Sequence, residues 1–214
     1  MLSIITNINI IFYVIAYLVG GIPFGYLIVK CFYKINILDI GSGSIGATNV
    51  YRALKHKTQN AKKLSILVII LDSTKGLVVV LMAKLFGLSY ETQWAIAILS
   101  VIGHCYSPYL KFNGGKGVST TIGSVILLIP IEGIIGLFAW FIVGKIFKVS
   151  SISSLIGVSV GILSSFVLPT ISPSISITAQ IGTHTPLIIL LVLIIYTHIP
   201  NIVRLIKKEE NKLF

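Results

Sequence analysis

The segment LSILVIILDSTKGLVVVLMAKLF occupies residues 64–86. A transmembrane helix needs about 20 predominantly apolar residues, and this segment is long enough to qualify. On either side of it, further apolar segments run over residues 8–32, 92–110, 118–129, 133–147, 151–168 and 186–199. We therefore predict an all-α membrane protein with seven transmembrane helices. The segment at 118–129 is short, which predicts that it begins inside a re-entrant loop within the membrane.

The composition supports this prediction. Of the 214 residues, 55% are hydrophobic and 11% are charged, and the mean hydropathy is +0.99. A soluble domain carries about 25% charged residues, so an ordinary cytosolic enzyme and a disordered tail are both excluded. The two cysteines, Cys31 and Cys105, are too few for a disulfide framework. We expect residues 1–214 to form one integral-membrane domain in the cytoplasmic membrane.

The positive charges predict the orientation of the chain. Cytoplasmic loops of membrane proteins are enriched in Lys and Arg. With seven spans, fifteen basic residues fall on one side, and only Lys84 and Lys75 lie elsewhere. The N-terminus is then outside and the C-terminus is cytoplasmic. The net charge of +11 is typical of this bias and of contact with anionic lipid, so we expect no nucleic-acid partner.

The first of three polar clusters is GSGSIGATNVYR at residues 41–52. Glycines permit turns with positive φ, and successive N–H groups in such turns form an anion-binding concavity. Arg52 adds a planar guanidinium suited to phosphate. The spacing Gly41-x-Gly43-x-x-Gly46 also matches the dinucleotide-binding fingerprint, but that motif requires a preceding β-strand, and here a membrane span precedes it.

The second cluster is GHCYSPYLKFNGGKGVST at residues 103–120, and the third is HIPNIVRLIKKEE at residues 198–210. Lys116 lies in a glycine loop before a helix start, where free N–H groups attract anions. The loop is not a Walker A motif, because Leu110 and Gly117 occupy positions that need glycine and serine or threonine. All three clusters lie at cytoplasmic ends of predicted spans, which predicts an anion site at that membrane face.

Two ionisable residues lie inside the span at 64–86. Asp72 and Lys75 are three residues apart, so they share a helix face and can pair. Such residues are functional by default, although an ion pair that locks the span against the loops is an equal alternative. His104 at the end of the next span is either a packed histidine or a site residue. No His, Cys and carboxylate set has zinc spacing, so we expect no metal.

These clusters resemble the motifs of the bacterial PlsY family, the acyl-phosphate:glycerol-3-phosphate acyltransferases. Residues 41–52 resemble the first family motif, residues 103–120 the second, and residues 198–210 the third. The resemblance covers nearly the whole chain. It implies transfer of a fatty acyl group from acyl-phosphate to the 1-hydroxyl of sn-glycerol 3-phosphate, giving 1-acylglycerol 3-phosphate (lysophosphatidic acid) and phosphate. It implies no cofactor, and it implies membrane lipid and a soluble acyl-phosphate-producing enzyme as partners.

The resemblance also implies roles for individual residues. The expected catalytic residues are Ser42, Arg52, Lys116, His198 and Asn201. The expected substrate-binding residues, including backbone donors, are Gly43, Thr48, Asn49, His104, Gly114 and Gly115. Asp72 and Lys75 are expected to support the site. Whether His198, His104 or the leaving phosphate accepts the hydroxyl proton stays open at this point.

Two other functions fit a basic multi-span protein. A transporter for an anionic metabolite would explain seven spans, but internal repeats are expected of many transporters and none is visible here. A non-catalytic lipid-binding protein would explain a diffuse basic patch, but it would not need three polar clusters organised by glycines. Product formation from two defined substrates would separate both alternatives from an enzyme.

Overall fold

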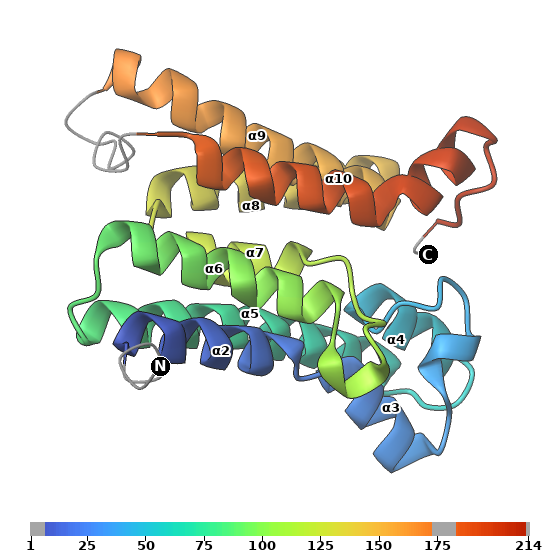
Figure 1. The fold of residues 1–214 in the computed structure, drawn as a ribbon. Coiled ribbons are helices and arrows are strands. Elements are labelled where there is room, and N and C mark those ends of the chain that lie inside the picture. The colour runs from blue at the N-terminus through green and yellow to red at the C-terminus, as the bar shows by residue number, and fades with distance from the viewer. Residues whose placement is uncertain (1–6, 173–182, 213–214) are drawn as a thin grey trace.

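A computed structural model describes residues 7–172 and 183–212, and every regular element in these residues is helical. The described chain contains nine α-helices and two short 3₁₀ turns (Figure 1). The elements are α2 (Ile8–Gly21), α3 (Phe24–Tyr33), η1 (Ile37–Asp39), α4 (Ala47–Leu54), α5 (Ala61–Leu85), α6 (Tyr90–Cys105), η2 (Pro108–Leu110), α7 (Val118–Val125), α8 (Pro130–Phe147), α9 (Ser150–Ile171) and α10 (Thr185–Ile206).

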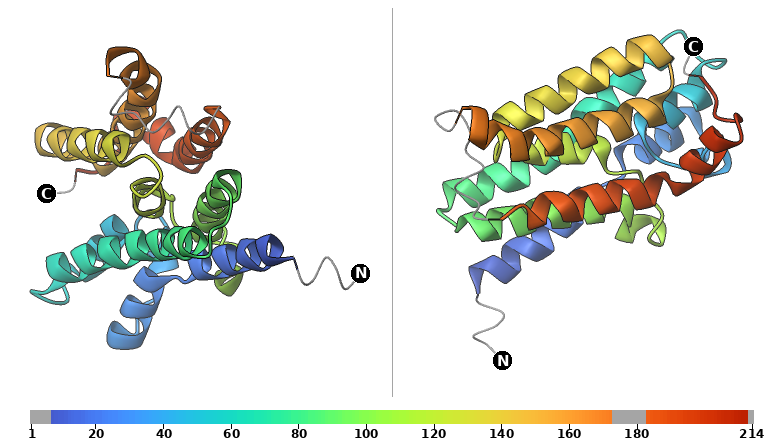
Figure 2. Two further views of the ribbon diagram at one scale, coloured as in Figure 1. Left: turned by 90° about the vertical axis from the view of Figure 1, so that its left-hand side faces the viewer. Right: turned by 90° about the horizontal axis from the view of Figure 1, so that it is seen from above.

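The helices form two groups that lie one above the other. Figure 1 shows α2, α5, α6 and α7 in the lower group and α8, α9 and α10 in the upper group. The end-on view in Figure 2 separates the same two groups. The short helices α3 and α4 lie at one end of the bundle, together with the end of α10 and the connection between α6 and α7. The three polar clusters therefore meet at one end, as predicted.

The predicted span at 8–32 is broken into α2 and α3. Pro23 stands between the two helices, and their axes are bent by 40°. Proline lacks the N–H that would continue the helix, and its ring clashes with the preceding turn, which explains the break. The bend directs α3 towards the polar end of the bundle.

The predicted span at 118–129 is α7, which contains only eight residues. At 1.5 Å per residue it is about 12 Å long, far less than the ~30 Å hydrocarbon core of a bilayer. The break predicted near residue 130 is present, because α8 begins at Pro130 in the first-turn position that proline favours. α7 is thus a short internal helix that starts at the polar end.

By length and composition, four helices can cross a membrane, or five if α2 and α3 form one bent span. The four are α5, α8, α9 and α10. α6 has 16 residues and falls short of the length required. These helices carry large apolar side chains that the described residues leave exposed, including Ile66, Phe138 and Val192. Such surfaces are stable against lipid, not against water.

α6 lies against α2 at unusually close range. A Cβ atom on Gly20 would lie 2.1 Å from the carbonyl oxygen of Ser100, and one on Gly103 would lie 2.2 Å from that of Tyr17. Small residues allow backbones to approach in this way in membrane helices. The contact fixes the polar end of α6, where His104 lies.

A separate apolar cluster supports the first polar cluster. Ile37, Ile45, Val50 and Leu54 are fully buried, and they pack with Val68 of α5. Burying each such side chain contributes about 1.5–3 kcal/mol. The loop before α4 and α4 itself are therefore anchored to α5.

Candidate active site

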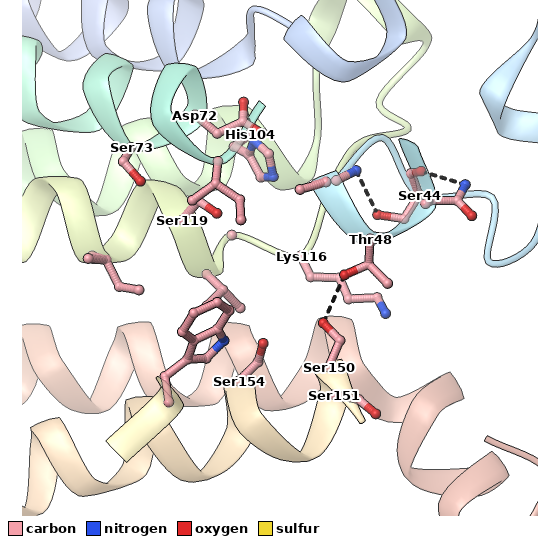
Figure 3. Close-up of a pocket in the computed structure, with 18 of the residues that line it drawn as sticks. Ser44, Thr48, Asp72, Ser73, His104, Lys116, Ser119, Ser150, Ser151 and Ser154 are labelled. Atoms are coloured by element: carbon pink, nitrogen blue, oxygen red, sulfur yellow. Dashed lines mark hydrogen bonds and ion pairs between the residues drawn. The ribbon is translucent and has the colours of Figure 1, made fainter. Parts of the chain in front are cut away.

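A cavity of about 440 Å³ lies between the two groups of helices (Figure 3). All three polar clusters contribute to its wall. At one end its lining is polar and basic, and elsewhere it is apolar. The predicted residues that line it are Ser42, Thr48, Asn49, Arg52, Asp72, His104, Lys116, His198 and Asn201.

Asn49 organises the first glycine loop. Its Nδ2 lies within hydrogen-bond distance of the carbonyl oxygens of Ile37, Ile40 and Ser44, at 3.2, 2.9 and 2.8 Å, and its Oδ1 accepts from the N–H of Ser42 at 3.2 Å. The side chain is 1% exposed. Gly41 and Gly43 adopt φ values of +57° and +67°, which side-chain-bearing residues rarely do. Asn49 thus holds the loop and presents Ser42 and Arg52.

We expect Asn49→Ala to lower the thermal unfolding temperature clearly, because the half-buried Ser42 N–H and Ser44 carbonyl lose the hydrogen bonds that Asn49 makes to them. Each such group costs about 1–3 kcal/mol. Unfolding can be followed with a thiol-reactive fluorescent dye in a Cys31→Ser background, since Cys31 is exposed and would react in the folded state, whereas Cys105 is buried and becomes reactive on unfolding. Asn60→Ala is the control, because the exposed Asn60 side chain caps no helix. Equal unfolding temperatures for the two variants would contradict the role of Asn49.

The second glycine loop lies directly against α6. The N–H of Gly115 donates to the carbonyl oxygen of His104 at 2.9 Å, and the N–H of Ile45 donates to the carbonyl oxygen of Gly114 at 3.4 Å. A Cβ on Gly115 would lie 1.9 Å from His104 Nε2. The two glycine loops are therefore hydrogen-bonded to each other. Lys116 is the residue after Gly115, and its side chain lines the cavity.

Lys116 belongs to a chain of polar contacts that crosses the cavity end. Its Nζ donates to Asn201 Oδ1, and Asn201 Nδ2 donates to Glu210 Oε1 at 2.7 Å. Glu210 also accepts from Arg204 Nε at 2.7 Å and from the Ser151 hydroxyl at 3.1 Å. These contacts hold Lys116 and Asn201 in fixed positions, as preorganised electrostatics requires.

Burial lowers the pKa of Lys116 to about 8, although Glu210 opposes this shift, and the positive charges of Arg204 and Arg52 add to it. For the carboxyl of Glu210, the partners outweigh burial. Burial alone would raise the pKa of Glu210, but hydrogen bonds from Arg204 and Asn201 hold it below its usual value. The basic end therefore contains three cationic side chains and one carboxylate. An additional anion there would be stabilised.

His198 and Asn201 lie one turn apart on α10, and both are buried. His198 Nδ1 lies 2.8 Å from the carbonyl oxygen of Ile194. A carbonyl only accepts, so Nδ1 carries the proton and Nε2 is left to accept a hydrogen bond. Because the His198 side chain lines the cavity, Nε2 can accept a hydrogen bond from a ligand there.

The predicted pair of Asp72 and Lys75 is confirmed. Lys75 Nζ lies 2.8 Å from Asp72 Oδ1, and both side chains are buried. Lys75 also lies 2.9 Å from His104 Nδ1. Asp72 and His104 line the cavity, whereas Lys75 lies behind them.

Three predicted glycines do not line the cavity: Gly43, Gly114 and Gly115. The N–H of Gly43 already donates to the carbonyl oxygen of Ile40, and that of Gly115 to His104. Gly114 packs against the backbone of His104 and Cys105. Within the described chain, these three positions shape the loops, and the N–H groups of Gly43 and Gly115 already have backbone partners.

Sequence reasoning assigned no site role to several serine hydroxyl groups of α5, α7 and α9. Ser150, Ser151 and Ser154 face the cavity from one side, and Ser73 and Ser119 from the other (Figure 3). The Ser150 hydroxyl lies 2.9 Å from that of Thr48, which joins α9 to α4. The spacing of the α9 serines is the signal, since Ser154 lies one turn after both Ser150 (i, i+4) and Ser151 (i, i+3).

The other part of the cavity is apolar. It is lined by Ile69, Ile70 and Leu77 of α5, by Ile122 of α7 and Ile126 just after it, and by Leu137 and Trp140 of α8. A narrow apolar cavity of about 40 Å³ adjoins it at Val118, Ile122, Leu137 and Trp140. Among the described residues, no three His, Cys or carboxylate side chains are grouped to hold a metal ion. The site joins a cationic end to an apolar channel.

Comparison with known proteins gives one consistent family. A family model described as glycerol-3-phosphate acyltransferase matches residues 10–208. The glycerol-3-phosphate acyltransferases of Helicobacter hepaticus, Helicobacter pylori (strain ATCC 700392 / 26695) and Wolinella succinogenes are 65%, 51% and 52% identical to this chain. The matches cover 97%, 99% and 99% of this chain and 95%, 98% and 99% of those relatives, respectively.

Two crystal structures are similar along nearly the whole chain. Both are of PlsY, an integral membrane glycerol 3-phosphate acyltransferase, one in a glycerol 3-phosphate form and one in a lysophosphatidic acid form. The TM-scores are 0.80 and 0.75, at 30% and 31% identity. Each match covers 95% of this chain and 94% of the other.

Proposed function

This chain belongs to the glycerol-3-phosphate acyltransferase family, and we propose that it transfers a fatty acyl group from acyl-phosphate to the 1-hydroxyl of sn-glycerol 3-phosphate. The products are 1-acylglycerol 3-phosphate (lysophosphatidic acid) and inorganic phosphate, in the first step of phospholipid synthesis. As an acyltransferase with the fold of PlsY, the chain is a multi-pass membrane protein.

The two-part cavity supports acyl-phosphate as the acyl donor and glycerol 3-phosphate as the acceptor. A single cavity combines a cationic end, lined by Arg52 and Lys116, with an apolar channel. Both proposed substrates carry a phosphate, and one of them carries a long hydrocarbon chain. The cationic end suits the phosphates, and the apolar channel between α5, α7 and α8 suits the acyl chain.

In this proposal Arg52 and Lys116 bind phosphate and neutralise the charge that develops as the bond to the leaving phosphate breaks. Preorganised cations and hydrogen-bond donors of this kind supply much of enzymatic rate enhancement. Ser42 and Thr48 add hydroxyl donors from the first loop and α4. Asn49, Gly43, Gly114 and Gly115 act through the shape of the loops.

His198 and Asn201 position glycerol 3-phosphate. The Nε2 of His198 accepts a hydrogen bond from a substrate hydroxyl, since its Nδ1 is occupied by the Ile194 carbonyl. The hydroxyl oxygen attacks the acyl carbon, the bond from that carbon to the phosphate oxygen breaks, and the phosphate leaves with the hydroxyl proton. Orientation and electrostatics are sufficient because the donor is already activated.

The proposal includes a topology. Residues 1–214 form one domain with seven membrane segments, counting α6 and the short α7, with the N-terminus outside and the C-terminus cytoplasmic. The basic residues gathered around the polar end support this orientation. The site then lies at the cytoplasmic face of the cell membrane, where glycerol 3-phosphate arrives from the cytosol. A soluble enzyme that makes acyl-phosphate is the proposed source of the donor.

The pKa of Lys116 gives a pH prediction. A lysine with a pKa of about 8 is charged below that pH and loses its charge above it. We expect kcat/KM for glycerol 3-phosphate to fall as the pH rises through about 8, since kcat/KM reports the ionisation of the free enzyme. Lys116→Arg should remove this fall from whatever activity remains, because arginine stays charged. An unchanged alkaline fall in that variant would contradict the assignment.

Product formation tests the function against its rivals. Purified protein in liposomes, given palmitoyl-phosphate and glycerol 3-phosphate, should release phosphate and 1-acylglycerol 3-phosphate in equal amounts. Movement of glycerol 3-phosphate across the liposome membrane without any product would support a transporter instead. Absence of both product and flux would leave a lipid-binding role and would also refute the proposal.

A further inference from the structure

Lys75 fixes the protonation of the His104 ring. Its Nζ lies 2.8 Å from Asp72 Oδ1, 2.8 Å from the carbonyl oxygen of Ile22 and 2.9 Å from His104 Nδ1. The carboxylate of Asp72 supports the charged ammonium. His104 Nδ1 also lies 3.6 Å from Asp72 Oδ1, a distance too long for a hydrogen bond. An ammonium group only donates, so His104 Nδ1 accepts at the 2.9 Å contact with Lys75. The single proton of the neutral imidazole is then on Nε2.

The Nε2–H group of His104 is directed to the second glycine loop and the cavity. The ring is 3% exposed and lines the cavity beside Asp72 and Ser119 (Figure 3). Its Nε2 packs so closely on Gly115 that no Cβ would fit there. Within residues 7–172 and 183–212, Nε2 forms no hydrogen bond. Buried donors normally have a partner, so this donor is available to a ligand.

The position of His104 along the cavity indicates which substrate atom it meets. Arg52 and Lys116 line the cationic end, which suits the phosphates. Ile69 and Ile122 line the apolar part. His104 lies beside Asp72 and Ser119, with Ser73 on one side of it and Lys116 on the other (Figure 3). An acyl-phosphate that spans both parts places its carbonyl group at this level.

We propose that His104 is a catalytic hydrogen-bond donor to the carbonyl oxygen of the acyl-phosphate, and that Lys75 is the positioning residue that keeps the proton on Nε2. This inference rests on the proposed function. When the hydroxyl oxygen attacks the acyl carbon, negative charge develops on the carbonyl oxygen and His104 stabilises it. His104 keeps its proton throughout, and the hydroxyl proton leaves with the phosphate.

His198 provides an internal contrast. Its Nδ1 donates to a backbone carbonyl, so its proton is on the opposite nitrogen. Both rings line the same cavity, yet one presents a donor and the other an acceptor. The two histidines are therefore not interchangeable, and His104 is excluded as a general base.

Nitrogen NMR of the active protein labelled with ¹⁵N-histidine tests the tautomers directly. We expect His104 to have a protonated Nε2 and a bare Nδ1, and His198 to have the reverse. The other two histidines are His56 and His184, and single substitutions assign each signal. A proton on Nδ1 of His104, or a fully charged ring, would overturn the inference whether or not the enzyme is active.

Kinetics test the role. We expect His104→Phe to lower kcat by about 100-fold, the effect of removing one oxyanion donor, while KM for glycerol 3-phosphate changes little. His104→Gln, which restores an amide donor, should recover part of kcat. Lys75→Met should lower kcat and give a mixture of the two His104 tautomers in the NMR spectrum. Lys75→Arg should restore kcat and the single tautomer protonated on Nε2.

Two outcomes are distinguishable. An unmodified protein that makes no product from acyl-phosphate refutes the proposed function. An active protein in which His104→Phe keeps full kcat refutes only the role of His104. If a variant does not fold, the tautomers of the unmodified protein still decide the inference.

Discussion

Replacing Lys116 with alanine is expected to lower the rate of phosphate release from palmitoyl-phosphate by about 1,000-fold. Loss of one preorganised donor costs about 100- to 1,000-fold, and this side chain also supplies a charge at a buried site. Arg52→Ala should have a comparable effect, since it lines the same cationic end. The measurement is phosphate released by purified protein with saturating glycerol 3-phosphate.

Lys111→Asn is the matched control for Lys116→Ala. Lys111 lies in the same connection, is exposed and does not line the cavity. Its φ of +53° is a conformation that asparagine tolerates. We expect this variant to keep nearly full activity. Full activity in Lys116→Ala, with dye-monitored unfolding unchanged in both variants, would exclude the assigned role.

Gly115→Ala is expected to lower kcat/KM by more than about 100-fold. The new methyl group would lie 1.9 Å from His104 Nε2, so either the ring or the glycine loop must move. Movement of the ring removes a donor, and movement of the loop displaces Lys116, the next residue. A displacement of about 1 Å at a reacting group costs on the order of 100-fold.

Gly87→Ala is the control for this substitution. Gly87 has a φ of +68°, and a Cβ there would have no atom within 4 Å. The change carries backbone strain of about 1 kcal/mol but no clash. Its kcat/KM should match the unmodified protein at a temperature where both are folded. Equal activity of Gly115→Ala and Gly87→Ala would contradict the packing of His104 on Gly115.

Much of the fold follows from hydropathy. The apolar segments at 64–86, 133–147, 151–168 and 186–199 correspond to α5, α8, α9 and α10, because long apolar helices have few alternatives to a lipid environment. The ends shift by up to seven residues. The sequence predicts some continuation of the last span beyond residue 199, and α10 continues through Pro200 to Ile206.

The convergence of the polar clusters also follows from the sequence, since alternating spans place them at one end. The structure adds which hydrogen-bonding atoms of these clusters are already paired within the protein. Asn49 turns inward to the loop backbone, and the N–H groups of Gly43 and Gly115 are already bonded. Such pairings depend on backbone directions that residue types do not specify.

Glu210 illustrates a second reason why sequence reasoning is incomplete. It lies beyond the end of α10, yet its carboxylate contacts Asn201, Arg204 and Ser151. The chain reverses at Lys208, whose φ is +59°, and the N–H of Glu209 bonds back to the carbonyl oxygen of Arg204. A turn of this kind at lysine has no strong sequence signal.

Donor choice is the most direct test of acyl transfer from acyl-phosphate. Purified protein in lipid nanodiscs is given glycerol 3-phosphate with either palmitoyl-phosphate or palmitoyl-coenzyme A, and 1-acylglycerol 3-phosphate is measured by mass spectrometry. We predict product with palmitoyl-phosphate, released together with an equal amount of phosphate, and none with palmitoyl-coenzyme A. Product from palmitoyl-coenzyme A with none from palmitoyl-phosphate would contradict the proposed function.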